Sequence, residues 1–155
     1  MSNRILSYRS LLADGGIDTI LLSTKKGEIG YRIHKFELMS YNFGHSASEA
    51  ESTVKIFKEE QSTAASSVDF SDNRLIAAAQ IGISGDPAVY SAAKIVIFDQ
   101  EIFNQDIYIT HKNQHSDASA VNYYLELEII KLDESQAMVA TLGYQKQQLD
   151  TLSGS

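Results

Sequence analysis

The stretch from Lys94 to Leu132 constrains the fold more than any other part of the chain, because it holds the densest run of β-branched and aromatic residues. It divides into three segments rich in such residues: Lys94–Phe98, Glu101–Thr110 and Val121–Leu132. Residues of these types favour β-strands. We therefore predict three strands, of which the last two form a long hairpin across a polar loop.

The last of these segments alternates apolar and acidic positions. One face would carry Tyr123, Leu125, Leu127 and Ile129. The opposite face would carry Glu126 and Glu128. This alternation is typical of a half-buried strand, so we expect Leu125 and Leu127 to lie in the core.

The segment Ile95–Phe98 has an apolar residue at every position. Such a run is typical of a central strand that is covered on both faces. We therefore expect Ile95 and Ile97 to lie in the core as well. The loop Lys112–Ala120 is expected to be exposed and available for contact.

Further strand signals precede this stretch. Ile17–Thr24 and Ile29–Ser40 flank a short polar turn, Lys25–Glu28, and predict a hairpin. Within the second strand the apolar positions change from odd to even near His34–Lys35, which predicts a β-bulge or a strand that crosses between sheets. Asn73–Ser84 alternates like a half-buried strand, although its alanines leave a helix open.

Other segments are ambiguous from their pattern alone. Arg4–Ala13 fits one helical face, and it fits an N-terminal arm that packs on a neighbour equally well. Asp14–Gly16 is a turn signal, because glycine adopts positive φ without steric cost. Ser46–Glu60 could open a short helix, and Val54–Phe57 within it could equally be strand. Gln61–Ser67 is small and polar, which predicts an exposed loop.

The whole pattern contains about seven to nine short strands with turn signals and no βαβ alternation. It predicts an all-β fold: an antiparallel β-sandwich, jelly-roll-like, with at most one short helix. A length of 155 residues suits one domain. We assign residues 1–144 to a single domain with an N-terminal arm, closed by a strand at Met138–Tyr144. Residues 145–155 form a polar C-terminal tail.

Charge and cysteine content exclude several classes of function. The chain has 13 basic and 20 acidic residues, for a net charge of −7. Such a surface repels nucleic acid and anionic lipid at long range, so we expect no direct contact with either. The absence of cysteine excludes disulfides, thiolate zinc sites and cysteine nucleophiles. No apolar run has the length of a signal peptide or a membrane span, so we expect synthesis and folding in a cytoplasm.

His111 and His115, with Asp117 nearby, form the cluster that most resembles a site. Two histidines four residues apart can ligate zinc on a helix. Here the segment is expected in a hairpin loop, where that spacing fixes no geometry, and no glutamate lies between the two for metalloprotease chemistry. A solvated loop is the more ordinary interpretation.

The acidic residues offer two further candidate sites. Glu126 and Glu128 share a strand face and could form a carboxylate pair for glycoside hydrolysis. A catalytic acid needs a partly apolar pocket to raise its pKa, and solvent-facing glutamates are the more ordinary interpretation. A calcium site remains open, without EF-hand spacing, among four scattered aspartates: Asp69, Asp72, Asp86 and Asp99.

Tyr123 and Tyr124 are candidates for a platform that stacks on sugars. Neighbouring strand residues point to opposite faces, so at most one of them belongs to such a platform. The chain contains no Gly-x-Ser-x-Gly motif and no phosphate-cradling glycine loop. We therefore predict no catalytic, cofactor-binding or metal-binding residues, no cofactor and no enzymatic activity.

Two passages of the sequence resemble parts of a known class of proteins over their whole length. One is Lys26–Met39, and the other is Phe103–Thr110, continuing after the loop as Asn122–Glu128. Together they resemble small virion structural proteins of tailed bacteriophages, particularly phages of marine bacteria. The resemblance implies a β-rich protein without catalytic residues that assembles on the particle, as a capsid decoration protein or a tail or connector component. The implied partners are the major capsid protein or other virion proteins, together with further copies of the chain.

Three hypotheses follow from these observations. The first is a non-enzymatic virion protein that stabilises the capsid. The second is a carbohydrate-binding β-sandwich for host attachment. The third is a small hydrolase that uses Glu126 and Glu128.

Overall fold

The computed structural model describes residues 4–22, 28–41, 50–83, 92–115 and 119–132. Within these ranges the chain forms eight strands and no helix. The strands are β1 (Ile5–Leu12), β2 (Ile17–Ile20), β3 (Ile29–Ser40), β4 (Ala50–Phe57), β5 (Leu75–Ile83), β6 (Ala92–Phe98), β7 (Ile107–Asn113) and β8 (Val121–Lys131). None of the described segments is a helix that could cross a membrane.

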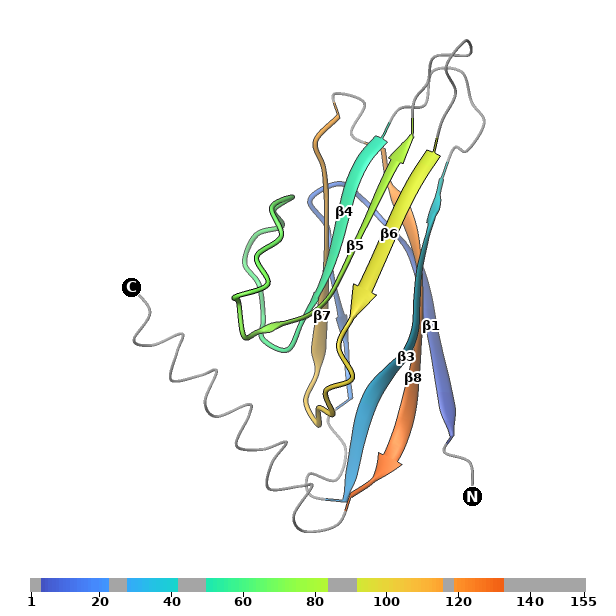
Figure 1. Cartoon of the computed structure of the whole chain (residues 1–155), viewed down its shortest axis with the longest axis vertical. Coiled ribbons are helices and arrows are strands. Elements are labelled where there is room, and N and C mark those ends of the chain that lie inside the picture. The colour runs from blue at the N-terminus through green and yellow to red at the C-terminus, as the bar shows by residue number, and fades with distance from the viewer. Residues whose placement is uncertain (1–3, 23–27, 42–49, 84–91, 116–118, 133–155) are drawn as a thin grey trace.

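The strands form two antiparallel sheets that pack face to face (Figure 1). The first sheet, sheet A, has the order β1-β8-β3, and the second, sheet B, has the order β2-β7-β4-β5-β6. Every strand pair that is recorded between these elements is antiparallel. The predicted antiparallel β-sandwich is therefore confirmed.

The strand order is close to that of a jelly roll. In an eight-stranded jelly roll a long folded hairpin brings together β1 with β8, β2 with β7, β3 with β6 and β4 with β5. Three of these four pairings are present here. The fourth is replaced, because β6 pairs with β5 and thereby joins sheet B. An ion pair between Lys94 and Glu37 links β6 with β3 at this side of the sandwich.

The predicted hairpin between the strands at Glu101–Thr110 and Val121–Leu132 is wrong. The first lies in sheet B as β7, and the second lies in sheet A as β8. The predicted hairpin of Ile17–Thr24 with Ile29–Ser40 is wrong for the same reason, since β2 and β3 belong to different sheets. In both cases the two strands place their apolar faces opposite one another across the core instead of side by side. The strand at Ile17 also ends at Ile20.

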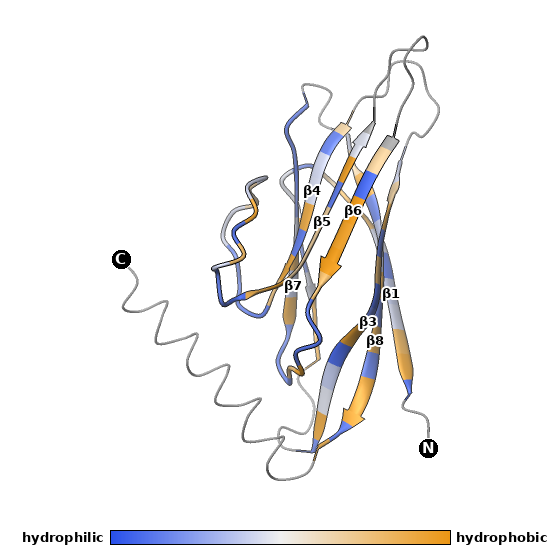
Figure 2. Ribbon diagram, in the orientation of Figure 1, coloured by the Kyte–Doolittle hydropathy of each residue, from blue (hydrophilic) through white to orange (hydrophobic). Residues whose placement is uncertain are grey.

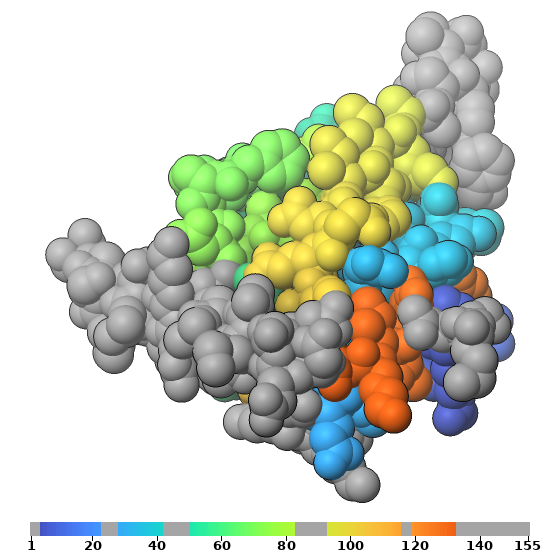
Figure 3. Space-filling view, turned by 60° about the horizontal axis from the view of Figure 1, so that its bottom comes forward, coloured from blue at the N-terminus to red at the C-terminus, as the bar shows by residue number. Residues whose placement is uncertain are grey.

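The prediction that Ile95–Phe98 is a covered central strand is also wrong. β6 is an edge strand of sheet B, and its apolar end is visible in Figure 2. Ile95 and Ile97 are 60% and 49% exposed, whereas Val96 and Phe98 face the core. In Figure 3 the yellow atoms of β6 lie at the surface between the green region and the cyan atoms of β3. The run is apolar on both faces, but only one face is covered.

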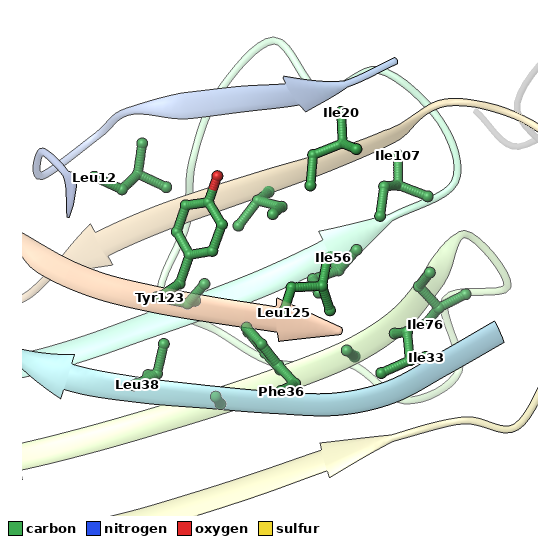
Figure 4. Packing of buried hydrophobic residues seen from close by; sticks show 14 of the residues in the cluster. Leu12, Ile20, Ile33, Phe36, Leu38, Ile56, Ile76, Ile107, Tyr123 and Leu125 are labelled. Carbon is green, nitrogen blue, oxygen red and sulfur yellow. The ribbon is translucent and has the colours of Figure 1, made fainter. Parts of the chain in front are cut away.

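The core is built from the inward faces of both sheets (Figure 4). Leu125 and Leu127 on β8 are fully buried, as predicted, and face Ile107 and Ile109 of the opposite sheet in one buried cluster. The loop before β7 closes one end of the core. Its Phe103 exchanges two backbone hydrogen bonds with Tyr31, at 2.7 and 2.9 Å, and the two rings stack with centroids 6.3 Å apart.

β3 contains the predicted β-bulge. Its pairing with β8 shifts between Ile33 and Lys35, so His34 is the extra residue. Before the bulge Ile33 points into the core, and after it Phe36 and Leu38 do so. The bulge therefore keeps apolar residues buried along a strand of 12 residues.

The ambiguous segments are resolved as strands. Arg4–Ala13 forms neither a helix nor a free arm, because β1 pairs with β8 along its whole length. The segment containing Val54, Ile56 and Phe57 is β4, and Asn73–Ser84 contains β5. The β4–β5 connection, with the predicted loop Gln61–Ser67, lies against the outer face of sheet B, where Lys55 Nζ donates to the Ser67 carbonyl at 2.8 Å. The predicted closing strand at Met138–Tyr144 and the tail at 145–155 lie outside the described residues.

Candidate interaction surface

His111 lies on β7 and is fully buried. Its Nδ1 is 2.9 Å from the Leu12 carbonyl oxygen and 3.1 Å from that of Ala13. Because a carbonyl only accepts, Nδ1 carries the proton, and Nε2 accepts from the Ser52 hydroxyl at 3.0 Å. Burial lowers the pKa of His111, and the hydrogen bonds to the two carbonyls oppose that change. The histidine is therefore neutral and occupied by structural contacts.

The turn between β1 and β2 is fastened to the same part of β7. Gly15 adopts a φ of 77°, which confirms the predicted turn at Asp14–Gly16. Gly15 N donates to the His111 carbonyl at 2.8 Å, and His111 N donates to the Gly16 carbonyl at 3.1 Å. The Asp14 carboxylate accepts from Asn113 N at 2.7 Å. His111 thus fixes the position of the β1–β2 turn through its backbone and side-chain hydrogen bonds.

The predicted cluster of His111, His115 and Asp117 is not assembled on one surface. His111 is inside the sandwich, His115 follows the end of β7, and Asp117 lies outside the described residues. No group of three or more histidine, aspartate or glutamate side chains in the described part of the chain could hold a metal ion. The loop Lys112–Ala120 is not wholly exposed either, because Asn113 belongs to β7 and is 2% exposed.

Glu126 and Glu128 lie on the outer face of β8, as predicted. In the register of sheet A, Glu126 is opposite Lys35, and Glu128 is opposite Arg32. The Arg32 guanidinium donates to the Glu128 carboxylate at 3.0 Å, and the Tyr124 hydroxyl donates to Glu126 at 2.7 Å. Each carboxylate therefore has a basic or hydroxyl partner on a solvent-facing sheet, without the apolar surroundings that a catalytic acid requires.

The aspartates are used in local turns. The Asp69 carboxylate accepts from the backbone and hydroxyl of Ser71, and these hydrogen bonds lower the pKa of Asp69. Asp72 accepts two hydrogen bonds from the Arg74 guanidinium, at 2.9 and 2.8 Å, which lower the pKa of Asp72. Asp99 follows β6, and Asp86 lies outside the described residues. The described aspartates do not converge on a calcium site.

Tyr123 and Tyr124 point to opposite faces of sheet A, as predicted. Tyr123 is 5% exposed, and its hydroxyl donates to the Asp18 carboxylate at 2.8 Å. Burial, followed by that hydrogen bond, raises the pKa of Tyr123. The Tyr124 ring is on the outer face, where its hydrogen bond to Glu126 raises the pKa of Tyr124. Of the two, only Tyr124 is available to a ligand.

The outer face of sheet A carries a groove that the sequence pattern did not indicate. It has a volume of about 730 Å³ and runs across three strands, with Lys94 of β6 at its side. Two cross-strand rows form its floor: Arg9–Tyr124–Glu37 and Leu11–Asn122–Met39. Lys35 lies beside the first row, with its ammonium 5.9 Å from the centre of the Tyr124 ring. We refer to this feature as the sheet A groove.

The sheet A groove combines positive charge with exposed apolar side chains. Arg9, Lys35 and Lys94 line it, against the single carboxylate of Glu37, in a chain whose net charge is −7. Met39 is 70% exposed and Leu11 is 45% exposed. This composition differs from that of an ordinary solvated sheet face, because hydrophobic and cationic groups are gathered in one concave surface.

Three comparisons with known proteins give no assignment. No protein-family model and no curated protein matches the chain. Among solved structures, a mitogen from Yersinia pseudotuberculosis is 14% identical over 81% of this chain and 86% of its own, with a TM-score of 0.33. The P-domain of Penaeus vannamei nodavirus is 12% identical over 85% of this chain and 99% of its own, with a TM-score of 0.30. A chain of Maize chlorotic mottle virus is 6% identical over 86% of this chain and 93% of its own, with a TM-score of 0.33. Likeness at this level shows neither a family nor a function.

The chemistry of the sheet A groove suits binding. Arginine and lysine side chains recognise carboxylates, and an exposed methionine adapts its shape to an apolar partner. A ligand that fits would present carboxylates to Arg9 and Lys35 and an apolar group to Met39.

Proposed function

We propose that this chain is a non-enzymatic structural protein of a tailed-bacteriophage particle, and that it decorates and stabilises the capsid. The observation that carries the proposal is the sheet A groove, a concave surface of basic and apolar side chains on an acidic protein. In the proposal the groove binds an acidic segment of the major capsid protein that also presents an apolar side chain. Opposite charge would favour the encounter, and burial of Met39 and Leu11 would contribute affinity.

The resemblance to virion proteins supports the same surface. The passages that carry it are Lys26–Met39, Phe103–Thr110 and Asn122–Glu128. The first contains most of β3 and the last lies within β8, the two strands that form most of the groove floor. Two of the three passages therefore lie on the strands that carry the proposed contact with the particle.

The test is binding to particles that lack the protein. Quantitative mass spectrometry should first find the chain at a fixed copy number on purified particles. The purified chain should then bind saturably to particles made without its gene and raise the temperature at which they release DNA. Absence from purified particles would end the proposal, and immunogold label on the tail alone would replace decoration by a tail or connector role.

A matched pair of variants tests the groove itself. Lys35→Glu reverses a charge in the sheet A groove, whereas Lys131→Glu makes the same change at the far end of β8. We expect Lys35→Glu to weaken particle binding about tenfold or more, as loss of a charged contact does. Lys131→Glu should change it less than about twofold. Equal effects of the two variants would show that the groove is not the contact.

Tyr124 supports a second candidate function, carbohydrate binding for host attachment. Its ring lies on the groove floor, flanked in its row by Arg9 and Glu37, with Asn122 in the next row. An aromatic face with polar neighbours is the arrangement that binds sugars. A glycan array should then give hits that are lost in Tyr124→Ala, and an array without hits, with and without calcium, would remove this candidate.

A further inference from the structure

β6 has one unpaired edge. On one side it pairs with β5 over seven residue pairs, and no described strand pairs with it on the other side. β3 lies nearby but belongs to sheet A, and the ion pair of Lys94 with Glu37 joins their side chains. A free edge of this kind is a template for another strand.

The alternation of the backbone determines which groups face that edge. Asp99 N donates to the Ile76 carbonyl of the neighbouring strand at 2.9 Å, so the odd-numbered residues of β6 direct their N–H and C=O groups toward β5. In an antiparallel ladder the groups of alternate residues point to opposite sides. Lys94, Val96 and Phe98 therefore present their N–H and C=O groups at the free edge.

The side chains beside this edge are apolar where they meet solvent. Ile95 and Ile97 are 60% and 49% exposed on the outer face of sheet B. Phe70, in the β4–β5 connection, is 68% exposed and lines a hollow of about 230 Å³ together with Ile97. On the outer face of β4, Thr53 and Lys55 are buried, and Lys55 donates a hydrogen bond to Ser67 of that connection. Ile95 and Ile97 on the outer face of β6 remain open to solvent.

We propose that β6 pairs with β6 of a second copy of this chain, antiparallel and about a two-fold axis at Val96. In this register Val96 meets Val96 of the partner subunit, and Lys94 meets Phe98 of the partner subunit. All three positions present free N–H and C=O groups, so they form hydrogen-bonded pairs. Ile95 then lies opposite Ile97 of the partner subunit on the outer face, in the closer, non-hydrogen-bonded type of pair.

Two other registers are less favourable. A shift of one residue would place free N–H and C=O groups opposite groups that already bond to β5. A shift of two, with the axis at Ile95, would bring the two Lys94 side chains into diagonal contact, where like charges repel. The axis at Val96 separates the lysines and matches the two isoleucine positions. The interface joins the five-stranded sheets of two subunits into one continuous sheet.

Sedimentation velocity of the full chain tests the pairing without any capsid, so its outcome is independent of the proposed function. The chain should dimerise in the micromolar range, as suits a small interface. The double variant Ile95→Lys/Ile97→Lys should weaken the dimer at least about tenfold. The control Leu21→Lys, at a residue that is 76% exposed beside β2, should change it less than about twofold. A monomeric chain, or equal dimerisation of all three proteins, would overturn the proposal.

Disulfide trapping tests the register, because the chain has no cysteine of its own. In a mixture of the single variants Ile95→Cys and Ile97→Cys, the disulfide between the two different chains should dominate. Their Cα atoms would lie about 4.5 Å apart, within the range of a disulfide. Dominant trapping of Ile95→Cys with itself would overturn the axis at Val96. A dimer that forms neither the mixed disulfide nor the disulfide of Ile95→Cys with itself would overturn pairing through β6. This test does not depend on whether the double variant Ile95→Lys/Ile97→Lys folds.

Discussion

The buried imidazole of His111 gives the sharpest test of the fold. In His111→Phe the ring is replaced by one of similar size that neither donates nor accepts. The Leu12 carbonyl and the Ser52 hydroxyl, 2.9 and 3.0 Å from the imidazole nitrogens, would lose this partner inside the protein. Each buried group left unsatisfied costs about 1–3 kcal/mol. We expect a loss of about 3 kcal/mol at neutral pH, or roughly 6–12 °C in Tm for a chain of this size.

The pH dependence of this loss tests the protonation state. Burial lowers the pKa of His111 in the folded state below the value of 6.5 that is usual for histidine. Between these two pKa values the unfolded chain binds a proton that the folded chain does not. Wild-type stability is therefore complete above about pH 6.5 and falls as the pH is lowered, by up to about 1.4 kcal/mol per pH unit. The variant lacks this proton, so its deficit should shrink on acidification.

Urea unfolding at about pH 7.5 and about pH 5.5 measures both effects. The control is His34→Gln, because the His34 side chain is 53% exposed and its replacement should cost less than about 0.5 kcal/mol. A deficit for His111→Phe that is equal at both pH values would show that His111 titrates alike in the folded and unfolded chain. A negligible deficit at neutral pH would contradict the hydrogen-bonding role itself.

Three further predictions concern stability alone. Leu125→Ala should lower the free energy of unfolding in urea by about 2–5 kcal/mol, because Leu125 is fully buried. The control Ile95→Ala should lower it by less than about 0.5 kcal/mol, because Ile95 is exposed. Similar losses for the two variants would contradict the edge position of β6. Gly15→Ala should lower the free energy of unfolding by about 1 kcal/mol and so lower Tm, because φ at this residue is 77° although a Cβ there meets nothing within 4 Å. An unchanged Tm would argue against the left-handed turn. The pKa of Asp72 is lowered by its hydrogen bonds to Arg74, so its contribution is present above about pH 4 and lost as the pH falls through the folded value. Asp72→Asn should therefore cost up to about 1 kcal/mol at neutral pH and almost nothing in acid, as chemical unfolding across pH would show.

The alternation of apolar and polar residues correctly predicts which side chains of a strand face the core, because it depends only on the two-residue period of the strand. Leu125 and Leu127 are inside and Glu126 and Glu128 are outside, as their positions indicated. The bulge at His34 is also predictable from the sequence, since the change of apolar positions from odd to even needs one extra residue. Such features are decided within a single strand.

The assignment of strands to sheets was not predictable in the same way. β7 and β8 are consecutive and both apolar on one face, which suits a hairpin as well as two opposed sheets. The choice depends on contacts with β1, β3 and β4, which are far away in the sequence. For Ile95 and Ile97, an apolar run on both faces predicts burial, but no strand among the described residues covers their outer face.

The sheet A groove was missed because no segment contains more than part of it. Arg9 comes from β1, Lys35 from β3, Tyr124 from β8 and Lys94 from β6. The outward position of Tyr124 could be derived from the alternation of β8. The order β1-β8-β3, which sets Arg9 and Glu37 on either side of it, could not.

The two proposed contacts, in the sheet A groove and along the free edge of β6, share the ion pair of Lys94 with Glu37. The Lys94 ammonium lies against Glu37 at the side of the sheet A groove, while its backbone N–H and C=O lie on the free edge of β6. A carboxylate bound in the groove would compete with Glu37 for Lys94, and a second copy paired along β6 would hold that lysine in place. Binding of an acidic segment and pairing of two chains must then influence each other. By thermodynamic linkage, the factor by which pairing changes affinity for the segment equals the factor by which the segment changes pairing.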